Sequence, residues 1–100
     1  MKINSDIGNN GKGSFFIEES GKRLGEMVVS VTSGNLTVFH TEVDDSLKGK
    51  GASTELLNAM TAYARAHNLK VIPLCSYVST QFRRHEQEYK DVWNKDWHNK

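Results

Sequence analysis

The chain has 100 residues, the length of one ordinary domain. Hydrophobic residues make up 37% of the chain and charged residues 25%, which argues against intrinsic disorder and against a coiled coil. The formal net charge of +1 is too small for a dedicated nucleic-acid binder. The single cysteine, Cys75, excludes an intramolecular disulfide and a zinc site built on several cysteines, so no metal is expected. No apolar run approaches ~20 residues and the amino terminus lacks the core of a signal peptide, so we expect one cytoplasmic domain over residues 1–100 with no membrane contact.

Three extended segments are predicted in the first half of the chain. Residues 1–12 are polar and turn-prone, so we expect no regular element there. Apolar or alternating runs then begin at Phe15, Leu24 and Leu36, and glycine-containing turns separate them. Because short loops join neighbouring antiparallel strands, the three runs predict an antiparallel meander that ends at Val43.

A change of period predicts a helix from Ala52 to His67. Its apolar side chains recur at steps of three and four residues, at Ala52, Leu56, Ala59, Met60, Tyr63 and Ala64. Asn68 suits the left-handed conformation that ends a helix. The apolar run Leu69–Leu74 predicts a fourth strand, parallel to the third because a helical crossover connects them. Pro73 places this strand at a sheet edge, or parting from its neighbour at that point.

The last part of the chain has roughly helical spacing from Val78 onward. Its apolar positions are Phe82, Tyr89, Val92, Trp93 and Trp97. An interruption is predicted near His85, and a mobile tail over residues 95–100. The predicted order is β-β-β-α-β-α. This is an α/β (α+β) fold with one mixed sheet, an antiparallel meander plus one parallel strand, and helices packed on the sheet.

The loop between the third strand and the long helix is a candidate binding site. Gly49 and Gly51 allow close main-chain approach to a ligand, because neither carries a Cβ. The unpaired N–H groups of the first helical turn suit a phosphate or diphosphate, and Lys48 and Lys50 add positive charge beside them. The alternative is a solvated glycine-rich turn with nothing bound.

Three motifs surround this loop in a fixed order. The loop reads Ser46-x-x-Gly49-x-Gly51-Ala52; His40-Thr41-Glu42-Val43 precedes it, and Pro73-Leu74-Cys75-Ser76-Tyr77-Val78 follows the helix. Together they resemble the acetyl-CoA-binding core of the GNAT N-acetyltransferases, whose signature is Gln/Arg-x-x-Gly-x-Gly/Ala, and more narrowly the small YjdJ-type branch. The resemblance covers residues 16–93. The chain departs from the family pattern at Ser46, where Gln or Arg is usual, and lacks a proline expected near residues 85–89.

The resemblance implies an N-acetyltransferase that moves acetyl from acetyl-CoA to a primary amine, by direct attack in a ternary complex. The pantetheine arm would lie along the third strand, and a main-chain N–H near Glu42 or Val43 would polarise the thioester carbonyl. The cofactor-binding residues that it implies are Thr41, Val43, Lys48, Gly49, Lys50, Gly51, Ala52, Ser53 and Ser76.

His40 and Glu42 are candidates for the base that takes the proton of the amine. They lie two apart on an extended strand, so both side chains leave one face, together with Leu36 and Val38. A histidine and a carboxylate this close could act as a base directly or through water. The alternative is a surface pair at the end of a strand.

Cys75 is the third candidate catalytic residue, at the carboxyl end of the fourth strand. A cysteine there could take the acetyl group covalently or contact the thiol end of the cofactor. No basic residue adjoins it in the sequence to favour the thiolate, and unpaired cysteines are often small buried side chains. Direct attack by the amine is the usual GNAT route.

A domain of this size has little surface for a deep acceptor pocket, so we expect a small amine or an exposed peptide lysine as acceptor. Two alternatives stay open. One is a non-catalytic acetyl-CoA sensor or protein-interaction module that uses the same cleft, and the other is an interaction domain without any ligand.

Overall fold

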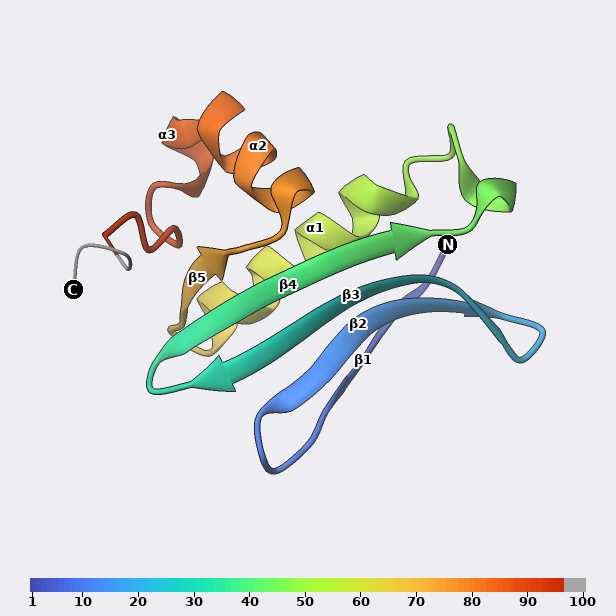
Figure 1. Cartoon of the computed structure of the whole chain (residues 1–100), viewed down its shortest axis with the longest axis horizontal. Helices are drawn as coiled ribbons and strands as arrows, with labels where there is room; N and C mark the ends of the chain where they lie inside the picture. Colours follow the sequence, from blue (N-terminus) through green and yellow to red (C-terminus); the bar gives the residue numbers. More distant parts are fainter. Residues whose placement is uncertain (97–100) are drawn as a thin grey trace.

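A single five-stranded sheet forms the frame of the molecule (Figure 1). The computed structural model describes residues 1–96. The strands are β1 (Ile3–Ile7), β2 (Lys12–Glu19), β3 (Lys22–Thr32), β4 (Asn35–Val43) and β5 (Lys70–Pro73), and they lie side by side in chain order. The first four pair antiparallel, whereas β4 and β5 pair in parallel. The predicted α+β sheet with one parallel pair is confirmed, in the order β-β-β-β-α-β-α.

The first strand, β1, was not expected, and the prediction that residues 1–12 hold no regular element is wrong. Ile3 lies opposite Ile17, and Ile7 lies opposite Gly13. Ile3 and Ile7 are half-buried against the core, while Asp6 is exposed. An edge strand can remain this polar because one of its faces and its outer edge meet water.

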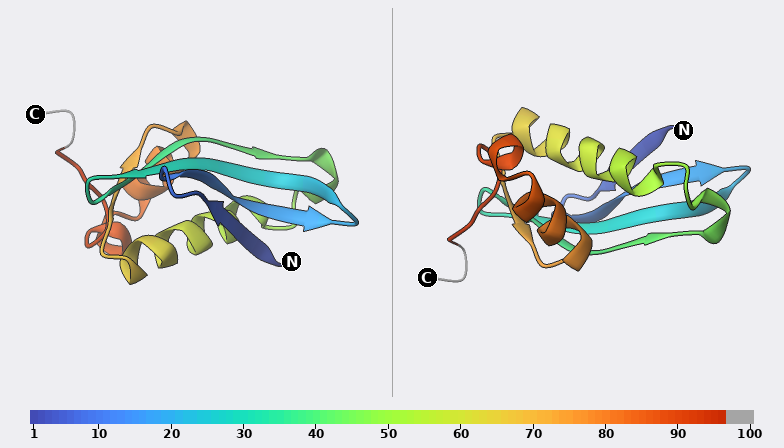
Figure 2. Two further views of the ribbon diagram at one scale, coloured as in Figure 1. Left: turned by 90° about the horizontal axis from the view of Figure 1, so that it is seen from below. Right: turned by 90° about the horizontal axis from the view of Figure 1, so that it is seen from above.

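The long helix α1 (Ala52–Ala66) covers one face of the sheet, and none of the helices described covers the other face over β2 and β3 (Figure 2). Alternate strand residues meet the apolar side of α1. Buried side chains on this contact include Phe15, Ile17, Met27, Val29, Leu36 and Val38 from the strands and Leu56, Met60 and Ala64 from the helix. No helix within residues 1–96 has the length and apolar character needed to cross a membrane.

The crossover after α1 follows the prediction. Asn68 adopts a positive φ of 56°, and β5 then forms the edge of the sheet beside β4. α2 (Ser76–Arg84) and the short α3 (Glu86–Tyr89) lie beside this edge, with the predicted break at His85 (Figure 1).

The carboxyl-terminal aromatic residues pack as the helical spacing suggested. The rings of Phe82 and Tyr89 stack with centroids 4.6 Å apart. Within the predicted mobile tail, Lys95 pairs with Glu86 at 2.6 Å, while residues 97–100, with Trp97 among them, lie outside the described residues.

The segment after α3 is fastened to both α1 and β5. Arg65 donates to the two carboxylate oxygens of Asp91, at 2.9 and 3.1 Å, and to the main-chain carbonyl of Glu88 at 2.9 Å. On the outer edge of β5, Val71 donates from its N–H to the carbonyl of Val92 and accepts from the N–H of Asn94. These contacts cover the edge of β5 over that stretch.

We predict that Asp91→Asn destabilises the protein in a pH-dependent way. The hydrogen bonds from Arg65 lower the pKa of Asp91 below its usual value. The stabilisation is therefore present above the ordinary aspartate pKa of about 3.9 and is lost as the pH falls through the lower pKa of the folded state. Because the pair is largely exposed, we expect a loss of about 0.5 kcal/mol at neutral pH. Urea unfolding should show this difference near pH 7, and the difference should shrink as the Asp91 carboxyl is protonated at low pH; a difference that does not change with pH would contradict the assignment.

Candidate functional site

A β-bulge at Phe39 divides β4 into two halves. Val29 pairs with Val38, but the preceding residue of β3, Val28, pairs with His40, so Phe39 has no partner on β3. An unpaired residue of this kind reverses the alternation of side chains beyond it. Leu36 and Val38 point to α1 before the bulge, and Thr41 and Val43 take the inner positions after it.

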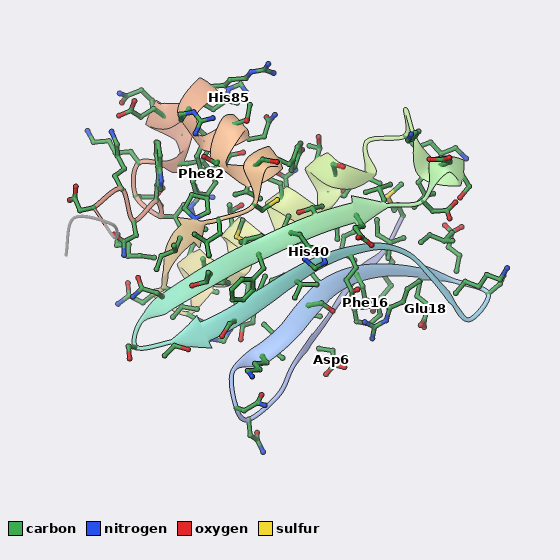
Figure 3. The ribbon with its side chains drawn as sticks, in the orientation of Figure 1. Asp6, Phe16, Glu18, His40, Phe82 and His85 are labelled. Carbon is green, nitrogen blue, oxygen red and sulfur yellow. The ribbon has the colours of Figure 1, made fainter. Side chains whose placement is uncertain are left out.

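The bulge places His40 and Glu42 on the outer face, which we define as the sheet face opposite α1. The expectation that they share a face with Leu36 and Val38 is therefore wrong. The pairings Asp6–Ser14–Val28–His40 and Asn4–Phe16–Glu26–Glu42 form two rows of side chains across this face. Both His40 and Glu42 are exposed, and Figure 3 shows His40 on the face turned to the viewer.

The parallel strands part beyond Val38 and Pro73, the last pair of their ladder. The carbonyl of Val38 accepts from the N–H of Cys75 at 2.9 Å, and β5 then gives way to α2. Cys75 is buried, and its Sγ lies 3.3 Å from Oγ1 of Thr41. Thr41, from the motif that precedes the glycine loop, and Cys75, from the motif that follows the helix, are thus neighbours at the point where the strands part.

The divergence leaves part of the β4 main chain open. Asp44 donates from its N–H to Leu24 of β3, so by antiparallel alternation Glu42 and His40 also bond toward β3. The N–H and C=O groups of Thr41 and Val43 then face the opposite way, toward the edge that β5 has left. Within residues 1–96, no hydrogen bond outside the β3–β4 ladder involves the main-chain N–H or C=O of Thr41 or of Val43.

The glycine loop follows a short 3₁₀ helix, η1 (Asp45–Leu47), and ends at the start of α1. Gly49 and Gly51 have φ values of 78° and 76°, which side chains rarely tolerate. Gly51 is the N-cap of α1 and provides no side-chain cap. The N–H groups of Gly49, Gly51 and residues 52–54 donate to no other described residue. They form a set of main-chain donors available to an anion.

These donors border a cavity of about 440 Å³ between the end of β4, the loop and α2. It is lined by Val43, Leu47, Lys48, Gly49, Gly51, Ala52, Ser53, Thr54, Tyr77 and Gln81. Of the cofactor-binding residues that the resemblance implies, six line this cavity: Val43, Lys48, Gly49, Gly51, Ala52 and Ser53. Lys50, Thr41 and Ser76 are near in sequence but do not line it, and the candidate catalytic residues His40, Glu42 and Cys75 lie outside it.

Four lining residues of the cavity are not among the site residues named by the sequence analysis: Leu47, Thr54, Tyr77 and Gln81. Tyr77 and Gln81 are four residues apart on α2 and therefore lie on one helical face, a spacing that could have indicated Gln81. Thr54 is in the first turn of α1, which the signature includes only as far as Ala52. No sequence signal distinguishes Thr54 from an ordinary helical threonine.

Of the two lysines in the loop, one forms an ion pair. Lys48 contacts Asp45 at 3.0 Å, and both side chains are largely exposed. Lys50 is exposed and has no ion-pair partner among the described residues. Asp44 caps η1, where a hydrogen bond from the N–H of Ser46 lowers the pKa of the Asp44 carboxyl. Asp44 is therefore an anion at neutral pH.

We predict that deleting Phe39 destabilises the protein no more than Phe39→Ala does. The substitution keeps the bulge and removes a half-exposed ring. The deletion removes the unpaired residue and joins Val38 directly to His40, so the ladder becomes regular with the same partners on β3, and His40 and Glu42 stay on the outer face. The cost of burying unpaired polar groups, about 2 kcal/mol, should therefore be absent from the deletion, and urea unfolding measures this. A loss that exceeds that of Phe39→Ala by such an amount would show that these side chains turn toward the core when the bulge is removed.

The comparisons with known proteins agree with this geometry. Residues 14–92 match the family described as GCN5-related N-acetyl-transferase. The solution structure of a GCN5-like protein from Staphylococcus aureus, provisionally named an N-acetyltransferase, is similar with a TM-score of 0.67 and 32% identity, over 90% of this chain and 86% of that one.

A second structure is similar in fold alone. It is the ribosomal-protein-S18-alanine N-acetyltransferase from Escherichia coli, with a TM-score of 0.59 and 16% identity over 67% of this chain and 44% of that one. No match was found among curated proteins. The family match spans most of the chain and the S. aureus protein is similar along nearly its whole length, so this chain belongs to the GCN5-related N-acetyltransferase family.

Proposed function

We propose that this protein transfers acetyl from acetyl-CoA to a primary amine, by direct attack of the amine within a ternary complex. The observation that carries the proposal is the group of unpaired main-chain donors at Gly49, Gly51 and residues 52–54, beside a cavity of about 440 Å³. Acetyl-CoA, when bound, supplies an activated acetyl thioester. Family membership supports the same reaction class.

The glycine loop is the proposed diphosphate site. Its N–H groups and the positive end of α1 favour an anion over a neutral ligand. Lys48 and Lys50 supply mobile positive charge at the rim, where an anion would compete with Asp45 for Lys48. An ideal Cβ built on Gly49 or Gly51 meets no atom within 4 Å, so a side chain there would project into the space that the ligand needs.

The open main chain of β4 is the proposed support for the pantetheine arm. The outward N–H and C=O groups of Thr41 and Val43 can bond the amides of the arm as a neighbouring strand would. Val43 also lines the cavity, so this edge continues into the diphosphate site. A main-chain N–H near Val43 then polarises the thioester carbonyl. Holding the two reactants in line supplies much of the rate enhancement, up to ~7–11 kcal/mol.

His40 and Glu42 are proposed to receive the proton of the attacking amine. They lie on the outer face, whereas the cavity lies on the side of α1 and α2. An amine that approaches from the outer face passes these two side chains before it reaches the point where β4 and β5 part. Either group can take the proton directly or through water.

Cys75 is proposed to flank the reacting end of the cofactor, with Ser76 beside it, without forming an acetyl-enzyme. Its thiol is buried and contacts the hydroxyl of Thr41. Among the hydrogen bonds of the described residues, this sulfur has one with Thr41 and none with a cationic side chain. Direct attack by the amine therefore stays the proposed route.

We predict that a saturating concentration of acetyl-CoA stabilises the folded protein. A ligand at a hundred times its Kd adds about 2.7 kcal/mol, which for this chain length raises Tm by about 10 °C or more. Gly51→Ala should lose most of this shift, because its Cβ enters the diphosphate site. Thermal unfolding with and without acetyl-CoA measures both effects.

Gly34→Ala is the matched control. Gly34 has a φ of 80° and equally open surroundings, but it lies in the β3–β4 turn at the opposite end of β4. Both variants should lose about 1–2 kcal/mol of stability from left-handed strain, and only Gly34→Ala should keep the response to acetyl-CoA. No shift for the unsubstituted protein, or equal shifts for both variants, would refute the proposed binding site. A shift without thiol release on any amine would identify a sensor in place of an enzyme.

We predict that Cys75→Ala keeps turnover within about tenfold of the unsubstituted protein, since it removes packing at the site and no reacting atom. Release of free CoA with a panel of primary amines measures this rate. Mass spectrometry of the unsubstituted protein after incubation with acetyl-CoA alone should show no acetyl adduct on Cys75. Loss of turnover in the variant together with an adduct would establish the covalent route.

A further inference from the structure

The helix α2 forms one wall of the cavity of about 440 Å³ and has few anchors of its own. Tyr77 and Gln81 line the cavity from this helix. Of its nine residues, Val78 and Phe82 alone are buried, and its N-cap, Cys75, makes no side-chain capping bond. Helices shorter than about 12–15 residues are marginal in isolation. The packing of Val78 and Phe82 on the core therefore holds this wall of the cavity in place.

Phe82 is covered by two rings that follow α2 in the chain. The buried ring of Phe82 stacks on Tyr89, with centroids 4.6 Å apart. The half-buried ring of Trp93 meets it edge-on, with centroids 5.7 Å apart and an angle of 63° between the planes. An edge-on aromatic pair stabilises a structure beyond the area that it buries. One of the two anchors of α2 thus depends on a residue outside the helix.

The main chain around Trp93 is fixed to the outer edge of β5, the strand beside which α2 lies (Figure 1). Val71 donates to the carbonyl of Val92 at 2.7 Å and accepts from the N–H of Asn94 at 2.9 Å, so that Trp93 pairs with Val71 in a parallel bridge. The side chain of Asn94 donates to the side-chain oxygen of Asn35 at 2.8 Å. The ring of Trp93 therefore starts from a fixed backbone and ties α2 to the sheet.

We infer that Trp93 is a positioning residue for the proposed cofactor site: through Phe82 it holds α2 in the place from which this helix walls the cavity. The inference rests on the proposed binding of acetyl-CoA. Tyr77 and Gln81 directly precede the two buried residues of α2, so a tilt or rotation that moves one pair moves the other. Trp93 does not line the cavity and would act on the ligand only through the helix.

A loosened α2 lowers the fraction of molecules in which the wall of the cavity is complete. The apparent Kd of a ligand rises as the inverse of the fraction of molecules that can bind it. Loss of the Trp93 ring should therefore weaken the binding of acetyl-CoA, although no atom that touches the ligand has been removed.

The test compares Trp93→Ala with Trp93→Phe and with the matched control Tyr63→Ala. Tyr63 is also a half-buried ring edge-on to a buried phenylalanine, Phe15, with centroids 5.5 Å apart and an angle of 74°. It lies on α1 and does not line the cavity. Urea unfolding shows first that each variant is folded. Trp93→Leu, which keeps an apolar side chain without a ring, takes the place of Trp93→Ala if that variant does not fold.

The first readout is amide hydrogen exchange of the protein without any ligand. Trp93→Ala should speed exchange at residues 80–84 of α2 by about 3- to 10-fold, the effect of losing one edge-on aromatic contact. Tyr63→Ala should leave these amides at the rate of the unsubstituted protein, because they open locally and do not depend on the packing of Phe15.

The second readout is the Kd of acetyl-CoA, measured by isothermal titration calorimetry. Trp93→Ala should raise this Kd by about 3- to 10-fold. Trp93→Phe, which keeps a ring at this position, and Tyr63→Ala should both stay within about twofold of the unsubstituted protein.

Any of four results would overturn the inference: an unchanged Kd in Trp93→Ala, an equal rise of Kd in Tyr63→Ala, a Trp93→Phe variant as weak as Trp93→Ala, or unchanged exchange in α2. The second would reduce the role of Trp93 to general stability. Failure of the unsubstituted protein to bind acetyl-CoA would instead reject the proposed function, on which the inference rests.

Discussion

The account depends on the main chain of β4, which changes its partners halfway along the strand. Up to Val38 the strand is bonded on both sides, by β3 and by β5. Beyond it β5 departs at Pro73, which cannot donate a ladder hydrogen bond, and the bulge at Phe39 reverses the side chains. Unpaired main-chain groups in a sheet require another partner, either water or a ligand. The departure of β5 therefore creates both the open edge and the opening that leads to it.

The second unpaired set of main-chain groups lies at the start of α1, where the N-cap is a glycine in the left-handed conformation. A serine or aspartate at the N-cap would accept a bond from the first turn and occupy one of its donors. Gly51 leaves all of them available, at the cost of a less stable helix end. Within one short stretch, from Thr41 to Thr54, the chain thus presents acceptors and donors on an open strand edge and a set of donors for an anion. This combination suits a ligand with an amide-containing arm and a diphosphate.

Much of this arrangement could be predicted from the sequence. Alternating runs and glycine turns located β2, β3 and β4, and the three- and four-residue period located α1 with its stop at Asn68. The glycine loop was predicted from the spacing of Gly49 and Gly51. β1 was missed because it contains only two strongly apolar residues, Ile3 and Ile7. An edge strand can be this polar, since much of its surface meets water.

The bulge at Phe39 was missed for a different reason. Simple alternation assigns His40 and Glu42 to the same sheet face as Leu36 and Val38, because all four have even numbers. It does not show where along the strand the even-numbered side chains change face. The sequence did contain a signal for this change of face. The inner residues are even-numbered at Leu36 and Val38, whereas the next apolar or β-branched pair, Thr41 and Val43, is odd-numbered. The position of Glu42 opposite Glu26 depends on the register of β3 against β4, which no local pattern contains.

The most direct test of the central claim is an amide NMR titration of the ¹⁵N-labelled protein with acetyl-CoA. The account predicts that the largest shifts fall on Gly49, Gly51, Ala52 and Ser53, followed by Thr41 and Val43, while amides of β1 and the β3–β4 turn stay in place. If the shifts gather elsewhere, or if these amides do not move at saturation, the main-chain groups left open by β4 and α1 are not the binding site.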